Sequence, residues 1–140
     1  MRRLDELEVE HLLFSDTVAR LATIDSHGYP HVTPIWFLCV DGVFHLTSYV
    51  GRPHLDRIVR NPRVGLVIDV EAALRPDGER PNKQVRVIGD ATVSPDRGGV
   101  WTARIRTKYV DAATCAADNV ARERALITVV PRTITAVASI

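Results

Sequence analysis

The sequence is short of several features that mark specialised classes of protein. Its 18 lysines and arginines nearly balance its 17 aspartates and glutamates, and the formal net charge is +1. This balance argues against a dedicated nucleic-acid binder, whose domain is usually strongly basic. No apolar run approaches the ~20 residues that a membrane-spanning helix needs. The chain starts with two arginines, but acidic residues in a helical pattern follow, so we expect no signal peptide. We predict neither a nucleic-acid nor a membrane partner.

Cysteine is scarce as well. Cys39 and Cys115 are the only two cysteines, and they lack the spacing of metal ligands, which favours a reduced, cytoplasmic protein. Neither cysteine has the acid–base pattern of a nucleophile beside it. His31, His45 and His54 are not spaced from one another as metal ligands usually are. We therefore predict no metal site.

The chain also lacks internal repeats and low-complexity tracts, and its 140 residues fit one domain, residues 1–140. A domain of this size buries roughly two-thirds of its unfolded surface. Short apolar runs separated by turn signals predict six or seven strands and three short helices. This combination is typical of a small β-barrel with helical caps, so we expect a mainly β (α+β) fold.

The most informative segment lies in the first half of the chain. Asp41-Gly42 stands between two apolar runs, which is the strongest short-range signal for a hairpin. It predicts strands at 31–39 and 43–48. A helix should follow, because Pro53 suits an early helical position and the Asn61-Pro62 step resists the helical conformation.

The predicted helix carries both apolar and basic residues. We expect Leu55, Ile58 and Val59 to face the core, with Arg57 and Arg60 pointing outward. A solvated face is the usual role of such arginines, although a polyanionic ligand would attract them.

Three later features complete the expected fold. Residues 64–70 form an apolar run that predicts a strand buried on both faces. Gly89 lies inside a further strand and marks a bulge or a sharp bend. The last apolar runs, at 126–130 and 134–138, predict a final hairpin.

A late helix should begin at Asp96, which is a plausible N-cap. Trp101, Ile105 and Lys108 follow with the spacing i, i+4, i+7, so packing is the dominant explanation of this stripe. Lys108 and the neighbouring Tyr109 are weak candidates for contact with a substrate.

Polar groups gather where the strand at 43–48 meets the next helix. Thr47 and Ser48 supply hydroxyls, and Gly51-Arg52 supplies backbone N–H groups and a guanidinium beside a helix N-terminus. This combination favours an anion site. We favour the anion role of Arg52 over that of an ordinary solvated residue. His54, close by, is a minor candidate for phosphate or substrate contact.

Three stretches of sequence together resemble a known family. They are the strand pair GYPHVTPIWFL…GVFHLTS, the helix end and strand IVRNPRVGLVID, and the strand KQVRVIGDATV. In this order they resemble the pyridoxamine 5′-phosphate oxidase-like split β-barrel family, which includes flavin- and deazaflavin-dependent relatives. The resemblance implies a six- to seven-stranded antiparallel split β-barrel with short flanking helices. It also implies a homodimer with cofactor sites at the subunit interface.

The resemblance also implies roles for individual residues. A hydroxyl at the end of the third strand and a basic residue entering the helix would hold the cofactor phosphate, and a glutamine would touch its ring. Gln84 matches that glutamine, although an exposed or structural role is about as compatible with the sequence. The cofactor-binding residues implied in this way are Thr33, Pro34, Ile35, Trp36, Thr47, Ser48, Arg52, Pro53, His54, Gln84 and Arg86.

Two departures from the oxidases indicate which branch the chain resembles. The second strand reads Val-Thr-Pro-Ile-Trp where the oxidases carry an Arg…Lys pair, and the chain lacks their C-terminal Arg-x-His signature. Oxidation of pyridoxamine phosphate is therefore not expected. The Pro-x-Trp-Phe strand looks more like the branch that uses the deazaflavin coenzyme F-420.

On this basis we expect an oxidoreductase that passes hydride from reduced coenzyme F-420 to a conjugated or aromatic small molecule. The alternatives are an oxidase-like protein that binds FMN, and a non-catalytic binder of flavin, deazaflavin or haem. A haem-degrading enzyme and a cofactor-free interaction module with a basic helix are further rivals.

Overall fold

The computed structural model describes residues 1–117 and 123–139. Its elements in chain order are β1 (Arg2–Arg3), α1 (Glu6–Phe14), β2 (Ala19–Ile24), β3 (Pro30–Ile35), β4 (Phe37–Val40), β5 (Val43–Tyr49), α2 (Pro53–Arg60), β6 (Arg63–Glu71), β7 (Asn82–Pro95), a 3-10 turn (Arg97–Gly99), α3 (Val100–Tyr109), α4 (Ala112–Ala117) and β8 (Arg124–Ala138).

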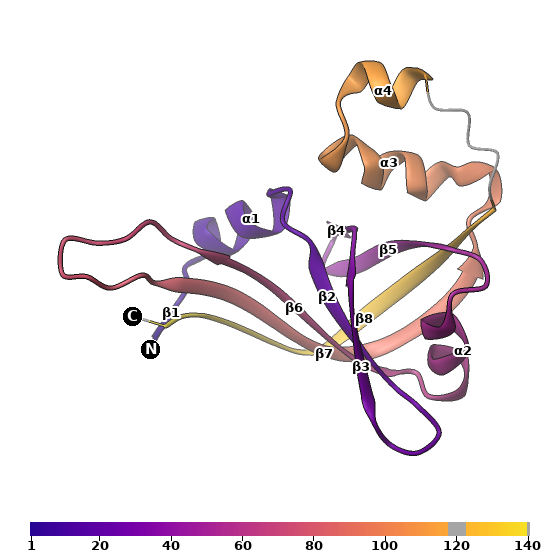
Figure 1. Cartoon of the computed structure of the whole chain (residues 1–140), viewed down its shortest axis with the longest axis horizontal. Helices are drawn as coiled ribbons and strands as arrows, with labels where there is room; N and C mark the ends of the chain where they lie inside the picture. The colour runs from indigo at the N-terminus through magenta and orange to yellow at the C-terminus, as the bar shows by residue number, and fades with distance from the viewer. Residues whose placement is uncertain (118–122, 140) are drawn as a thin grey trace.

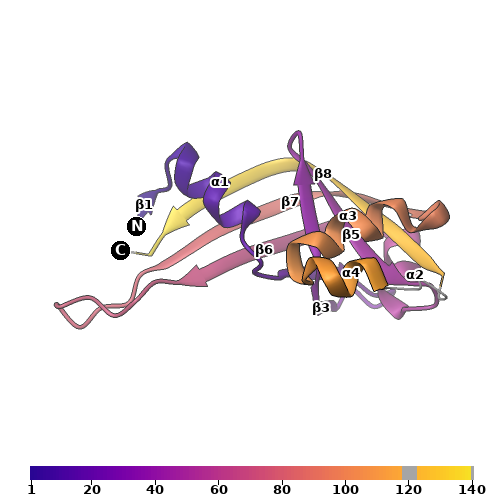
Figure 2. The same cartoon turned by 90° about the horizontal axis from the view of Figure 1, so that it is seen from above.

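The strands form one antiparallel sheet in the order β3-β2-β6-β7-β8-β5-β4, and β1 pairs with the end of β8. Figure 1 shows β6, β7 and β8 as a long curved ribbon, with α1 over one end and α3 and α4 over the other. Seen from above in Figure 2, the N- and C-termini lie close together, on the side where the β6–β7 hairpin extends beyond the sheet. The expected mainly β, antiparallel barrel-like fold is confirmed.

The connection between β3 and β4 explains why the sheet curls. These two strands stand at opposite edges of the sheet, yet only Trp36 separates Ile35 from Phe37. The two edges must therefore approach each other at Trp36. The single strand expected at 31–39 is wrong for this reason, because the chain changes edges in the middle of it.

The concave side of the curl holds the hydrophobic core. Phe37 and Phe44 lie on the paired strands β4 and β5, with ring centroids 6.1 Å apart. The largest fully buried side chains are Phe37, Phe44, Leu21, Leu46, Ile58, Leu66, Ile68, Ile105, Ile127, Val85, Val87 and Val129. These residues come from six strands and two helices, so the core ties the helices to the sheet.

Local signals in the sequence explain several boundaries. Asp41 and Gly42 both have positive φ, 51° and 76°, as a two-residue type I′ hairpin requires. Asp5 caps α1 in a capping box with Glu8. Pro53 begins α2, whose C-cap is Asn61. The predicted hairpin and the second helix are confirmed.

The bulge predicted at Gly89 is confirmed as well. Ile88 pairs with Thr133, but Gly89 pairs with Pro131, so Arg132 is an extra residue on β8. A Cβ atom at Gly89 would lie 2.6 Å from the backbone oxygen of Val130, and only glycine avoids this clash.

The final hairpin is wrong. β8 is one continuous strand of 15 residues, and the bulge absorbs Pro131 without a turn. Proline lacks the N–H that a regular ladder needs, but it is tolerated at bulges and at edges.

Two expectations about buried faces need correction. The apolar strand β6 is fully buried on one face only, because Val64, Leu66 and Ile68 are inside while Gly65, Val67 and Asp69, on the opposite face, are half-buried. On α2, Val59 is 73% exposed; the helix instead buries His54 beside Leu55 and Ile58.

The late helix begins later than expected. Its N-cap is Gly99, and the chain forms a 3-10 turn after Asp96. The Asp96 carboxylate still accepts hydrogen bonds from the backbone N–H groups of Trp101 and Thr102, at 3.1 and 2.8 Å. It therefore satisfies donors of the first turn from a position outside the helix.

Candidate functional site

A cavity of about 680 Å³ lies where β3, β5 and α2 meet, and its size falls in the range of small-molecule sites. We call it the arginine cavity. Its lining residues are Val18, Thr33, Pro34, Ile35, Trp36, Thr47, Ser48, Tyr49, Arg52, Pro53, His54, Arg57, Arg106 and Arg124. The structure thus brings together all the predicted cofactor-binding residues except Gln84 and Arg86.

The charge of the cavity is its most distinctive property. Arg52, Arg57, Arg106 and Arg124 line it, and the described lining includes no aspartate or glutamate. The N-terminus of α2 adds partial positive charge from its free N–H groups. Such a lining attracts an anion, and guanidinium groups match the geometry of phosphate and carboxylate.

Arg124 and Arg52 both lie near the aromatic ring of Tyr49. The Arg124 guanidinium lies 3.8 Å from the ring centroid of Tyr49, and Arg124 Nη2 donates to Tyr49 Oη at 3.1 Å. The Arg52 guanidinium lies 5.6 Å from the same centroid. Tyr49 therefore holds a cation from β8 near a cation from the start of α2.

The other two arginines are positioned by different partners. Arg57 Nε donates to Thr23 Oγ1 at 2.9 Å, so this side chain turns toward the sheet and not outward as expected. Arg106 lies 5.9 Å from the Trp36 ring. Each guanidinium is thus held on the cavity wall by a neighbour.

Ser48 and His54 form a buried pair on the wall, with Ser48 Oγ and His54 Nε2 2.8 Å apart. Burial, and then the charges of Arg57 and Arg52, lower the pKa of His54. This environment disfavours the imidazolium that a serine–histidine nucleophile pair must form during catalysis. We therefore interpret Ser48 and His54 as binding residues.

The hydroxyl of Thr47 belongs to a buried network. Thr102 Oγ1 donates to Asp96 Oδ2 at 2.6 Å, so the 2.7 Å contact between Thr47 and Thr102 must be a hydrogen bond donated by Thr47. Its single hydroxyl proton points to α3. Thr47 can therefore accept from a ligand but not donate to it in this arrangement.

Lys108 and Tyr109 do not line the cavity. Lys108 Nζ lies 3.4 Å from the Phe37 ring centroid and donates to the Leu13 backbone oxygen at 3.2 Å. Tyr109 Oη donates to Thr17 O at 3.0 Å and accepts from Phe37 N at 3.2 Å. Both side chains join α3 to its neighbours, which supports packing over substrate contact.

Gln84 and Arg86 also lie outside the cavity. Both stand on β7 in alternation with the buried Val85 and Val87, so they share a face as expected, and it is the convex face of the sheet. Gln84 Nε2 donates to Asn82 Oδ1 at 3.0 Å. Within one chain neither residue reaches the arginine cavity.

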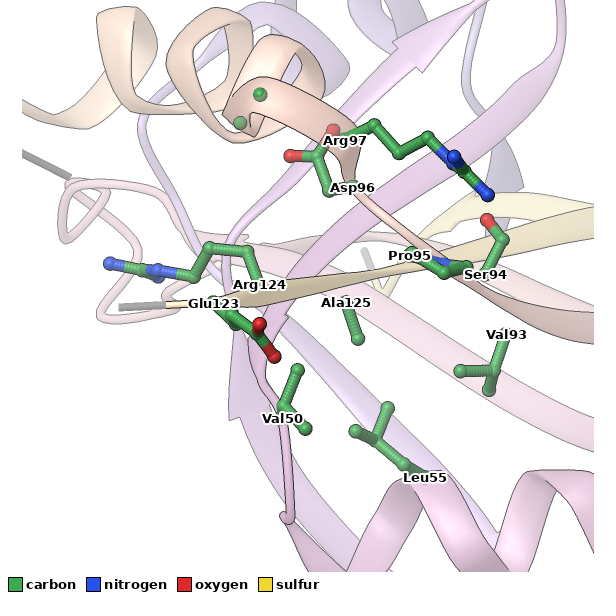
Figure 3. A pocket seen from close by; sticks show the side chains of 12 residues that line it. Val50, Leu55, Val93, Ser94, Pro95, Asp96, Arg97, Glu123, Arg124 and Ala125 are labelled. Carbon is green, nitrogen blue, oxygen red and sulfur yellow. The ribbon is translucent and has the colours of Figure 1, made fainter. Parts of the chain in front are cut away.

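A second cavity, of about 760 Å³, adjoins the first, and Arg124 lines both. In Figure 3 the side chains of Val50, Leu55, Val93 and Ala125 form its apolar part. Its polar lining mixes the two charge signs, because Asp96 and Glu123 accompany Arg97 and Arg124. The second cavity therefore lacks the uniform positive charge of the arginine cavity.

Comparison with known families agrees with this architecture. The family model described as pyridoxamine 5′-phosphate oxidase matches residues 6–138, nearly the whole chain. The chain belongs to the pyridoxamine 5′-phosphate oxidase family. No curated protein matches it in sequence.

Several solved structures have the same fold as this protein, although their sequence identity to it is low. An FAD-binding protein from Mesorhizobium loti has a TM-score of 0.68 and 21% identity, covering 99% of this chain and 98% of its own. A candidate 5-nitroimidazole antibiotic resistance protein from Bacteroides thetaiotaomicron has a TM-score of 0.74 and 15% identity, covering 94% and 82%. An F-420 reductase has a TM-score of 0.64 and 24% identity, covering 90% and 94%.

Sequence reasoning missed five residues that line the arginine cavity, namely Val18, Tyr49, Arg57, Arg106 and Arg124. No local motif marks them, and Arg124 enters the site only because β8 pairs with β5, so that Arg124 stands opposite Tyr49. Among the described residues, no group of three or more histidines, cysteines, aspartates or glutamates could hold a metal ion. None of the described helices is long and apolar enough to span a membrane.

Proposed function

We propose that this member of the pyridoxamine 5′-phosphate oxidase family is an oxidoreductase that binds a flavin-type cofactor in the arginine cavity. Coenzyme F-420 is the favoured cofactor, and FMN is the alternative. The observation that carries the proposal is the cavity lining, with four arginines and no carboxylate among its described residues. Flavin and deazaflavin cofactors carry phosphate, which such a lining would bind.

The chain's own residues would divide the work of binding. Arg52 and the N-terminus of α2 would hold the phosphate, because the single hydroxyl proton of Ser48 already points to the Tyr49 backbone oxygen at 3.0 Å. Pro34 and Trp36 would border the flat ring system, where apolar walls exclude water. When bound, the cofactor supplies hydride for a conjugated or aromatic small molecule. No side-chain nucleophile is required.

The preference for coenzyme F-420 rests on two supports. The second strand lacks the Arg…Lys pair of the oxidases and carries Pro34 and Trp36 in its place, and a structural neighbour is described as an F-420 reductase. Neighbours described as FAD-binding proteins keep a flavin as the alternative. They are also compatible with a protein that binds the cofactor without catalysing a reaction.

We also propose a homodimer in which two chains share each site. Gln84 and Arg86 lie on the convex face of β7, away from the cavity of their own chain. The same face exposes apolar side chains, including Val32 and Ile88, which are 65% and 59% exposed. Pairing of two such faces would cover this apolar surface and bring Gln84 and Arg86 toward the partner's cofactor.

The test is a parallel fluorescence titration with coenzyme F-420 and FMN. We expect binding at micromolar concentrations or tighter, a preference for coenzyme F-420, and clear weakening in Arg52→Ala. Arg60→Ala is the matched control, because Arg60 lies on the same helix but does not line the cavity. A preference for FMN would replace the favoured cofactor with the alternative. If neither cofactor binds, the proposed function is wrong.

A turnover measurement distinguishes an oxidoreductase from a protein that only carries the cofactor. Reduced cofactor bound to the protein is mixed with conjugated and aromatic acceptors, and its reoxidation is followed by absorbance. Oxidation faster than that of the free reduced cofactor would support an oxidoreductase. Binding without any acceleration across the acceptor panel would support the carrier.

A further inference from the structure

We propose that anion binding in the arginine cavity is coupled to the uptake of a proton by His54, so that its imidazolium becomes an additional cation facing the ligand. This inference rests on the proposed cofactor phosphate site and adds to it a protonation step.

The geometry places His54 where it can respond to a ligand. It lies in the first turn of α2, lines the cavity and is only 7% exposed. Its Nε2 atom is 2.8 Å from Ser48 Oγ, so the ring is fixed by a hydrogen bond. The protonation of a side chain held in this way depends on the charges that face it across the cavity.

The charges around His54 are almost all positive. Arg52 and Arg57 flank it on its own helix, Arg106 reaches the cavity from α3, and Arg124 reaches it from β8. Tyr49, on β5, lines the same cavity, and Asp56 is an exposed carboxylate two residues further along α2. From β2, Thr23 contributes only a neutral hydroxyl.

Without an anion these surroundings favour the neutral imidazole. Burial is the largest cause of the lowered pKa of His54, followed by the charges of Arg57 and Arg52. A phosphate between the arginines would offset their field and would itself attract an imidazolium. The pKa of His54 should therefore be higher in the complex than in the free protein.

Thermodynamic linkage between proton binding and ligand binding determines how affinity changes with pH. If ligand binding raises the affinity of His54 for a proton, the proton raises the affinity for the ligand by the same factor. Between the two pKa values of His54, affinity should fall as pH rises, by at most about tenfold per pH unit for one proton. Below both values this dependence disappears.

The experiment is calorimetric titration of the protein with FMN in buffers that differ in ionisation enthalpy, from about pH 7 to pH 8.5. The second pKa of a phosphomonoester is about 6, so the ligand is almost wholly a dianion across this range. We expect wild-type protein to take up a measurable fraction of one proton on binding. His54→Gln should bind FMN with no proton uptake and with an affinity independent of pH.

His45→Gln is the matched control. Burial also lowers the pKa of His45, but its ring stacks on Trp101 at 3.9 Å, and it does not line the arginine cavity. Proton uptake should persist in this variant. Uptake that is lost equally in both variants would contradict the assignment to His54.

A second measurement covers the case in which His54→Gln does not fold. The imidazole resonances of wild-type protein are followed by NMR against pH, with and without saturating FMN. A rise in the pKa of one buried histidine on binding supports the inference. FMN binding without proton uptake and without such a rise overturns it, while the proposed function stands. Absence of all FMN and coenzyme F-420 binding overturns both.

Discussion

The guanidinium of Arg124 lies on the ring of Tyr49, 3.8 Å from its centroid, and donates a 3.1 Å hydrogen bond to the Tyr49 hydroxyl. The two residues stand directly opposite each other in the pairing of β8 with β5, so sheet pairing itself brings the cation to the cavity. The Arg52 guanidinium lies 5.6 Å from the same ring centroid. Tyr49, at the end of β5, therefore lies close to an arginine of β8 and to the arginine that precedes α2.

Arg124→Gln should weaken cofactor binding. A hydrogen bond between charged groups contributes about 1.5–3 kcal/mol, so the dissociation constant for FMN or coenzyme F-420 should rise by roughly 10- to 100-fold. Fluorescence titration measures the change. Arg132→Gln, which removes an exposed arginine at the bulge, is the control and should bind normally. Equal affinity in the two variants would remove Arg124 from the site.

Tyr109→Phe should reduce stability and leave cofactor affinity intact. The variant keeps the ring stacked on Trp36 at 4.7 Å but leaves the Phe37 N–H without its acceptor. A buried donor without a partner costs about 1–3 kcal/mol of unfolding free energy, which urea denaturation measures. Tyr29→Phe, at a ring that is 69% exposed, is the control. Loss of affinity with unchanged stability would return Tyr109 to the list of ligand contacts.

Gly89→Ala should destabilise the fold. The new Cβ atom would lie 2.6 Å from the Val130 backbone oxygen, and overpacking of this kind costs about 1–3 kcal/mol. Gly65→Ala is a sharp control, because its nearest neighbours would be at an ordinary 3.8 Å. Chemical denaturation of both variants gives the comparison. Equal stability would mean that the bulge relaxes easily.

Lys108 should make the fold more stable as pH rises above about 8. Burial lowers the pKa of Lys108 from 10.5 to about 8, so between these values the unfolded chain binds more protons than the folded one, and unfolding free energy increases with pH. The pKa of Tyr109 is raised to about 12, so its opposing effect begins only near pH 10. Burial also raises the pKa of the Cys39 thiol above its ordinary 9.0, which opposes the rise at higher pH, so denaturation midpoints are compared from about pH 7.5 to pH 8.5.

The matched variants for this pH dependence use the two lysines of the chain. Lys108→Met should abolish the increase, whereas Lys83→Met, at a partly exposed lysine paired with Glu8, should keep it. A rise that persists in Lys108→Met would place the titrating group elsewhere.

Local sequence signals predicted the parts of the fold that local chemistry determines. Asp41-Gly42 requires positive φ, Pro53 favours a helix start, and Gly89 removes a Cβ that the backbone could not accommodate. Ser48 and Arg52 lie between the Asp41-Gly42 turn and Pro53. Much of the proposed phosphate site could therefore be predicted from residues that are close together in the sequence.

Features that depend on contacts between distant parts of the chain could not be predicted from the local sequence. Pro131 looked like a turn because its tolerance depends on a bulge formed with a strand more than 40 residues away. Arg124 lines the cavity through pairing of β8 with β5, and Lys108 gave no sign that it would lie under Phe37. Pairing and burial decide such contacts, and one strand's sequence does not encode its partner.

The bulge on β8 also bears on how the protein avoids uncontrolled self-association. Along the described residues 130–135, β8 pairs with β7 on one side only, because its pairing with β5 stops at Val129 and its pairing with β1 starts at Val137. An open backbone edge of this length invites strand addition and fibril growth. Pro131 has no backbone N–H to donate, and Arg132 is an extra, charged residue that interrupts the register of this strand. We therefore expect the irregularity that interrupts the sheet to disfavour cross-β aggregation as well.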